Sequence, residues 1–340
     1  MNPVSVRRSP AVLCLLLLML APLSEAKTYK VGIIPYLPAG EFIVADKLGL
    51  YKAEGLDVES LYYSSTGDWV RALQNKVLDF SGLWNATQVD MYFGGSNAKR
   101  LALMSYDTDD YRMIVRKGMT PAKMKDRPIA VFSDYFGTHW FLHDYLSPAS
   151  IGIHDVRIVE MNNEEAYKNF SFGRVDGMIF NGKFMDLALA NGTAKVADID
   201  RQLYLAATTG GPSYFENGET ISRETLKRFL RAWVKAMAWI EDDANDAAYR
   251  AMLLEAFSSS LELVGLENST DYTKRKPRSM LIPLKDLYQV NRSMGKMFDD
   301  LIQVRKKIGY ENDKPYRHED MFDATLILEV LRELGYSTMR

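Results

Sequence analysis

The chain has 340 residues, and its 42 lysines and arginines nearly balance its 44 aspartates and glutamates, giving a formal net charge of −2. This balance argues against nucleic acid or an anionic membrane surface as the main partner. The single cysteine, Cys14, excludes a disulfide within the chain and a metal site built from several cysteines. A secreted chain of this length without disulfides needs a large apolar core, which its 47% hydrophobic residues can supply.

Residues 1–26 have the pattern of a secretory signal peptide. Arg7 and Arg8 form a basic start, an apolar run covers residues 11–21, and Ser24 and Ala26 are small residues at cleavage positions. The apolar run is too short to span a bilayer as a stable helix. We therefore expect cleavage after Ala26 and secretion without stable membrane insertion, and a bacterial periplasm suits a chain without disulfides.

A strand, a helix and a second strand are predicted at the beginning of the remaining chain. Val31–Ile34 is a short apolar run that stops at a proline, as expected for a buried strand. Apolar residues then recur at helical spacing over residues 42–48, and Gly49 follows where a helix C-cap is expected. Residues 56–63 are rich in strand-forming side chains. In such a unit a ligand binds beyond the first strand, here at residues 35–42.

The chain then continues as alternating helices and strands. Helices are predicted at residues 66–75 and 85–93, and strands at 77–83, 101–106, 111–115, 126–132 and 156–161. Asn85 and Thr87 open a helix, where they either cap it or present its N–H groups to an anion. Gly137, Thr138 and His139 open another. His139 and His143 share one helix face, which can bind a metal but is more often structural.

The second half of the chain is predicted to return to the first sheet and to end in helices. A helix at 163–170 precedes a strand ending at residue 180, and the turn after it contains Asn181 but no carboxylate. A strand is expected at 201–209, followed by a loop, G-G-P-S-Y-F-E-N, that could bring Tyr214 to the ligand. Helices are predicted from Ser222 and over residues 247–257, 284–304 and 324–334, with the C-terminal helices packed on the first lobe.

Three stretches carry a resemblance to a known family. The order A-D-K-L-G-L-Y-K-A-E-G-L-D-V-E at residues 45–59 resembles the opening of periplasmic solute-binding proteins of ABC importers. The nearest branch contains the nitrate, sulfonate and taurine binders, grouped with thiamine-pyrimidine (NMT1/THI5-like) proteins. D-R-P-I-A-V-F at 126–132 is similar to the strand L-K-G-K-x-I-A-V, although Arg127-Pro128 replaces the usual Gly-Lys. S-F-G-R-V-D-G-M-I-F at 171–180 resembles the strand G-x-V-D-A, after which the family places ligand contacts. This resemblance implies a contact by Asn181, and the lack of a carboxylate there suits an anionic ligand better than an ammonium group.

The resemblance implies an α/β fold with two lobes, of the type II periplasmic-binding-protein class, with a hinge and a C-terminal helical addition. Residues 27–107 and 204–340 would form the first lobe, and residues 108–203 the second. The predicted loops and the resemblance together give the ligand-binding residues, which are Tyr36, Phe42, Trp84, Asn85, Thr87, Ser133, Thr138, His139, Asn181 and Tyr214.

The function that the resemblance implies is capture of a small anionic solute, such as a sulfonate or nitrate, by closure of the two lobes. The partners would be this small molecule and an ABC permease with its ATPase, and the protein would be a monomer without catalysis, cofactor or metal. Three alternatives remain: a binder of a thiamine-pyrimidine-like heteroaromatic, a periplasmic sensor that presents its ligand to a receptor kinase, and an enzyme of a related fold. The enzymes of that fold carry a cysteine-rich motif that this chain lacks.

Overall fold

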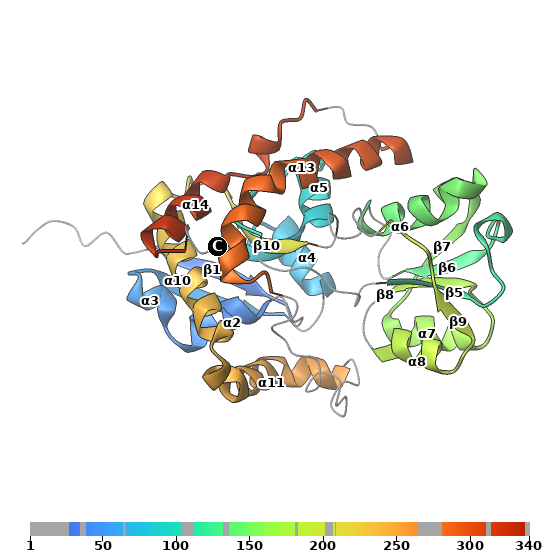
Figure 1. Ribbon diagram of the computed structural model, residues 1–340, viewed down its shortest axis with the longest axis horizontal. Helices are drawn as coiled ribbons and strands as arrows, with labels where there is room; N and C mark the ends of the chain where they lie inside the picture. The colour runs from blue at the N-terminus through green and yellow to red at the C-terminus, as the bar shows by residue number, and fades with distance from the viewer. Residues whose placement is uncertain are drawn as a thin grey trace, which may run out of the picture.

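The computed structural model describes residues 27–34, 39–63, 66–103, 112–131, 136–180, 183–200, 207, 209–263, 281–310 and 314–336. Its strands form two five-stranded sheets. Figure 1 shows these sheets in two bodies side by side, each with its own helices.

The first sheet has the strand order β2-β1-β3-β10-β4. Its strands are β1 (Thr28–Ile33), β2 (Asp57–Tyr62), β3 (Phe80–Trp84), β4 (Ala98–Arg100) and β10 (Gly210–Phe215). β1 is parallel to β2 and β3, whereas β10 is antiparallel to β3 and β4. Parallel neighbours need a crossover, which α2 (Gly40–Lys47) and α3 (Leu50–Ala53) provide between β1 and β2. The predicted strand–helix–strand unit is confirmed.

The second sheet has the order β7-β6-β8-β5-β9. Its strands are β5 (Arg112–Arg116), β6 (Pro128–Val131), β7 (Arg157–Glu160), β8 (Gly177–Phe180) and β9 (Ala194–Val196). β6 is parallel to β7 and β8, and β5 is antiparallel to β8 and β9. The helices of this part are α6 (Phe136–Leu146), α7 (Asn163–Ser171) and α8 (Lys183–Ala190). The α/β class is therefore confirmed in both bodies.

Two predicted segments were wrong. The strand expected at residues 101–106 is β4, which ends at Arg100, and Leu101–Leu103 follow it without strand structure. The loop expected at 210–217 is largely strand β10. Gly210, Gly211 and Pro212 favour a turn by composition, but pairing on both sides overrides that preference. A side chain at Gly211 would overlap the carbonyl oxygen of Ala102, so glycine lets the neighbouring backbone approach.

Helices from the C-terminal third cover the first sheet and extend beyond it. They are α10 (Arg223–Glu241), α11 (Asp246–Leu263), α13 (Leu284–Ile308) and α14 (Ala324–Glu333). Two further helices of the first body, α4 (Thr66–Gln74) and α5 (Asn85–Phe93), lie earlier in the chain. Short 3₁₀ turns are found at Pro121–Lys123, Ser147–Ala149, Ile153–Asp155, Asp243–Asn245 and His318–Asp320. α10 begins where the Ser222 hydroxyl accepts from the N–H of Thr225 at 3.1 Å. Its fully buried Phe229 stacks on Phe80 of β3, with ring centroids 4.0 Å apart.

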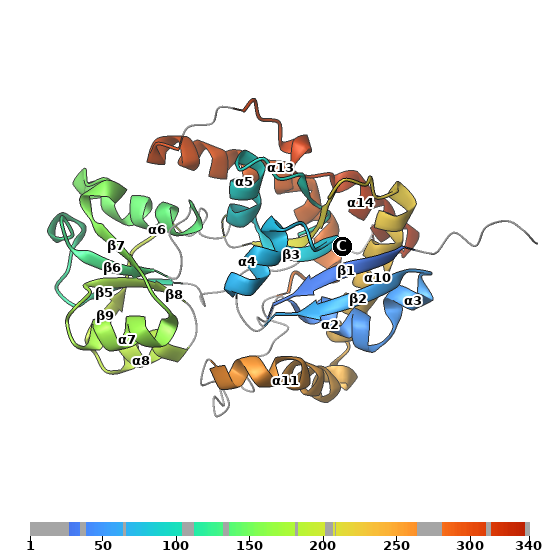
Figure 2. The ribbon, with the colours of Figure 1, turned by 180° about the vertical axis from the view of Figure 1, so that it is seen from behind.

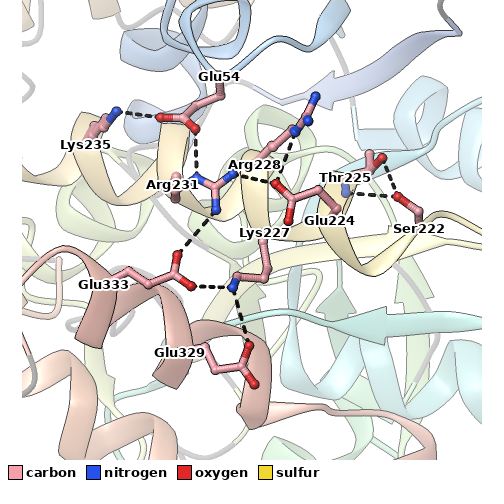
Figure 3. A network of polar contacts seen from close by, with 10 residues as sticks. All are labelled: Glu54, Ser222, Glu224, Thr225, Lys227, Arg228, Arg231, Lys235, Glu329 and Glu333. Carbon is pink, nitrogen blue, oxygen red and sulfur yellow. Dashed lines mark hydrogen bonds and ion pairs between the residues drawn. The ribbon is translucent and has the colours of Figure 1, made fainter.

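A surface network of charges ties α10 to α14 and to the end of α3 (Figure 3). Arg231 donates to Glu54 at 2.8 Å and to Glu224 at 2.9 Å, and it lies 3.4 Å from Glu333. Lys227 also pairs with Glu333. These hydrogen bonds to carboxylates raise the pKa of Arg231 above its already high value. The network therefore fixes the last helix on α10 through partly exposed ion pairs.

Arg231→Gln is expected to lower the free energy of unfolding by about 1 kcal/mol, because exposed ion pairs contribute little each and Arg231 makes three. Urea denaturation should show this difference at low salt and a smaller one at about 1 M salt, where the charges are screened. Arg292→Gln, on the exposed side of α13, is the matched control and should leave the stability unchanged. Equal loss at both salt concentrations would contradict an electrostatic origin.

Candidate functional site

The topology brings one edge of each sheet together. In the first sheet the chain leaves from Leu103, after the carboxyl end of β4, and reaches Arg112 at the beginning of β5. It returns after Asp200 to Gly210, which pairs with Trp84 at the carboxyl end of β3. Both connections therefore join the carboxyl edge of the parallel strands in one sheet to that of the other. In Figure 2 the arrowheads of β1 and β2 point toward the second body. Ligands of α/β folds bind at such edges.

From the first sheet, α5 begins at this edge directly after β3. Trp84 takes the N-cap position with an extended backbone and without a side-chain cap. Asn85 is fully buried, and its backbone N–H donates to the carbonyl oxygen of Thr209 at 2.9 Å, whereas Thr87 is half-buried. Asn85 and Thr87 are thus not the N-cap of α5, and their predicted contact with a ligand stays a prediction.

From the second sheet, α6 begins beside α5. The N–H of Phe136, in its first turn, donates to Asp90 Oδ2 of α5 at 3.0 Å, so a carboxylate from one body occupies the positive end of a helix from the other. Thr138 is fully buried and His139 is 9% exposed. The segments predicted around Asn85 and Thr138 are therefore brought together, although they belong to different sheets.

α13 bridges these two helices. Arg305 donates to Asp90 Oδ1 at 2.5 Å, and its guanidinium lies over the rings of Phe136 and Tyr310 at 5.5 and 4.3 Å. The hydroxyl of Tyr310 lies 2.5 Å from His139 Nδ1. Burial raises the pKa of Asp90, and the charge of Arg305 opposes that effect. The prediction that the C-terminal helices pack on the first lobe was therefore incomplete, because α13 also contacts α6 of the second body (Figure 1).

Arg112 is a charged side chain at this edge that the sequence analysis missed. It opens β5 and lies opposite Phe180, the last residue of β8. Its Nη2 donates to Asp186, in the first turn of α8, at 2.5 Å, while its buried Nε has no hydrogen-bond partner in the described part of the chain. A guanidinium held by one carboxylate, with a donor left over, is suited to a second anion. The only signal in the sequence was an arginine in the predicted strand 111–115, just after the predicted boundary between the lobes at residue 107.

Glu41 is a second residue that the sequence analysis missed. It lies in the first turn of α2, the helix that follows the carboxyl end of β1, and it is 0% exposed. Within the described residues, neither of its carboxylate oxygens has a hydrogen-bond partner in another residue. Burial raises the pKa of Glu41 to about 8, and its own backbone N–H offsets only part of this effect. In the sequence it stands directly before the apolar run of α2 and resembles an ordinary helix-start glutamate.

The other predicted ligand-binding residues have different surroundings. Phe42 is 1% exposed and packs against Phe229, with ring centroids 6.3 Å apart, so it belongs to the core of the first body. Tyr214 was expected at the ligand, but it lies inside β10 opposite Phe80, four residues from the end that pairs with Trp84. Its burial raises its pKa to about 12. The predicted residues Tyr36, Ser133 and Asn181 lie outside the described residues.

The described residues show neither a metal site nor a membrane-spanning helix. They contain no group of three metal-ligating side chains, and no described helix is long and apolar enough to cross a membrane. His139 instead contacts Tyr310, and burial lowers the pKa of His143.

The fold and part of the sequence match known proteins. A family model described as NMT1/THI5 like matches residues 39–247. No curated protein matches the sequence. Among solved structures, the periplasmic nitrate-binding protein NrtA from Synechocystis PCC 6803 is similar with a TM-score of 0.65 and 14% identity, over 92% of this chain and 90% of its own.

Two further structures have similar scores. A ligand-binding component of an ABC-type import system from Staphylococcus aureus, with zinc bound, has a TM-score of 0.64 and 16% identity over 89% of this chain and 99% of its own. The alkanesulfonate-binding protein SsuA from Xanthomonas axonopodis pv. citri, bound to MOPS, has a TM-score of 0.58 and 15% identity over 82% of this chain and 93% of its own. At these identities the likeness shows a shared fold.

Proposed function

Because the chain belongs to the NMT1/THI5-like family, we propose that it is the substrate-binding component of an ABC importer and captures a small organic or inorganic anion. The observation that carries this proposal is the meeting of the two carboxyl edges, where α5 and α6 begin and where Arg112 keeps a donor that no described residue pairs. Helix N-termini and a guanidinium both favour negative charge. The names of the similar proteins, which include binders of nitrate and alkanesulfonate, point in the same direction.

The proposal includes a division of the chain and a place of action. We propose that residues 27–107 and 204–340 form one lobe and residues 108–203 the other; both boundaries lie outside the described residues. Residues 1–26 would be removed after export, and the protein would act in the periplasm as a monomer without catalysis. Closure of the lobes about the two connections would bury the ligand and create the form that the permease recognises.

A thermal-shift screen of the purified protein tests this function. The panel contains taurine, longer alkanesulfonates, nitrate, bicarbonate, aromatic carboxylates and thiamine precursors. A compound present at 100 times its dissociation constant stabilises the folded state by about 2.7 kcal/mol, which raises the melting temperature by several degrees. We expect a hit among the anions. Hits confined to thiamine precursors would favour a heteroaromatic ligand, and the absence of any hit would contradict the proposed binding function.

Arg112→Gln is expected to lower the affinity for the anion that gives the largest thermal shift by about 10- to 100-fold. The reason is that a hydrogen bond to a charged group contributes roughly 1.5–3 kcal/mol. Isothermal titration measures the change. Arg157→Gln is the matched control, because Arg157 is an exposed arginine at the opposite, amino-terminal edge of the same sheet. Equal affinities of the Arg112 variant and the unchanged protein would exclude Arg112 from the site.

A further inference from the structure

We propose that Glu41 forms a second subsite for a cationic nitrogen, so that the ligand carries both an anionic and a protonated amino group. This inference rests on the proposed binding function and narrows its substrate class.

Burial without a partner is the first step. Carboxylates inside proteins are almost always paired with a cation or held by several donors, because the loss of water is costly. Both carboxylate oxygens of Glu41 are buried, and no other residue donates to them in the part of the chain that the structure describes. By contrast, Glu54 accepts from Arg231 and Lys235, and Asp79 accepts from the N–H of Lys30 and pairs with Lys27. Glu41 is therefore a buried carboxyl group that no other described residue pairs, and an external cationic donor could pair it.

Position is the second step. α2 follows β1 in the parallel pair with β3, so its first turn lies at the same sheet edge as the beginning of α5. The hydroxyl of Tyr249, from α11, lies against the backbone of Gly40, where an added side chain would overlap it. The backbone of Glu41 thus lies at the edge to which the two inter-sheet connections lead, and its side chain is fully buried there.

Charge is the third step. Once it gives up its proton, a carboxylate in the first turn of a helix cancels the positive end of the helix dipole, so ionised Glu41 favours a cationic donor over an anion. At the edge of the other sheet, Arg112 has the opposite charge. A ligand that spans both edges would place its anionic group at Arg112 and its ammonium group at Glu41. An anion without a nitrogen would leave Glu41 unpaired when the lobes close.

Matched pairs of ligands test the inference by isothermal titration. We compare taurine with ethanesulfonate, 3-aminopropanesulfonate with propanesulfonate, and β-alanine with propionate, in the unchanged protein and in Glu41→Gln. We expect at least one amine to bind 10-fold or more tightly than its partner without the amine, and Glu41→Gln to abolish this preference. Glu59→Gln, an exposed glutamate on β2, is the control and should keep it.

The outcomes separate this inference from the function on which it rests. A preference that survives in Glu41→Gln, or equal affinities within every pair, would overturn the role of Glu41 and leave anion binding intact. Binding of nitrate or simple sulfonates with no binding by any amine would also overturn it. Failure of the whole screening panel would instead overturn the binding function. Circular dichroism of Glu41→Gln checks that the variant is folded, and Glu41→Asp, which keeps the charge on a shorter side chain, should retain part of the preference.

Discussion

Glu41→Gln is expected to increase the free energy of unfolding of the ligand-free protein, by about 4 kcal/mol at pH 8 and by about 1 kcal/mol at pH 5. The folded-state pKa of Glu41 is about 8, against an ordinary value of 4.5. As the pH rises from 4.5 to 8, the unfolded chain releases this proton while the folded protein still holds it. The contribution of Glu41 to stability is therefore complete below pH 4.5 and is lost as the pH rises toward 8. A glutamine is neutral throughout and avoids the loss.

Urea denaturation at pH 5 and pH 8 measures this difference, with Glu59→Gln as the control because its side chain is exposed. The control should leave the stability unchanged at both pH values. A Glu41→Gln variant that is equally stable to the unchanged protein at pH 8 would show that Glu41 is not a costly buried acid. Together with the expected results for the ligand pairs, this result would mean that Glu41 destabilises the ligand-free protein and also binds the ligand.

Asp90→Ala is expected to lower the free energy of unfolding by about 3 kcal/mol, because it leaves the buried guanidinium of Arg305 without its carboxylate. The value lies at the lower end for broken buried pairs, since 23% of the Asp90 side chain is exposed. The variant also removes the acceptor for the N–H of Phe136 at the beginning of α6. The variant should therefore destabilise the junction of α5, α6 and α13.

A double variant provides the control for this result. Asp90→Ala/Arg305→Met removes both charges and keeps an apolar side chain beside Phe93, so it should be more stable than Asp90→Ala alone. Denaturation of both single variants and the double variant gives the coupling free energy. A coupling near zero would mean that the pair does not hold α13 to α5.

The fold was predictable where local pattern and tertiary pairing agree. Apolar runs stopped by proline or glycine predicted β1 and α2, and α10 follows from the polar Ser222 before an apolar stripe. β10 was not predictable in this way, since glycine and proline suit a turn when read alone. Only the pairing of β10 with β3 and β4 makes a strand of it.

The helix starts that form the candidate site were predicted from the sequence, but its charged residues were not. The starts of α5 and α6 were expected from the resemblance, and the structure brings them together through Asp90. Arg112 and Glu41 escaped because their significance depends on burial and on missing partners, which a sequence does not contain. The absence of a carboxylate after β8 suggested an anion alone, whereas the buried carboxylate lies on the other sheet, at α2.

A crystal structure of the protein with the best-binding compound of the matched pairs tests both proposed contacts directly. We expect a ligand between the carboxyl edges of the two sheets, with its anionic group on Arg112 and its nitrogen within hydrogen-bond distance of Glu41. A ligand bound away from these edges, or one between them that touches neither Arg112 nor Glu41, would contradict this expectation.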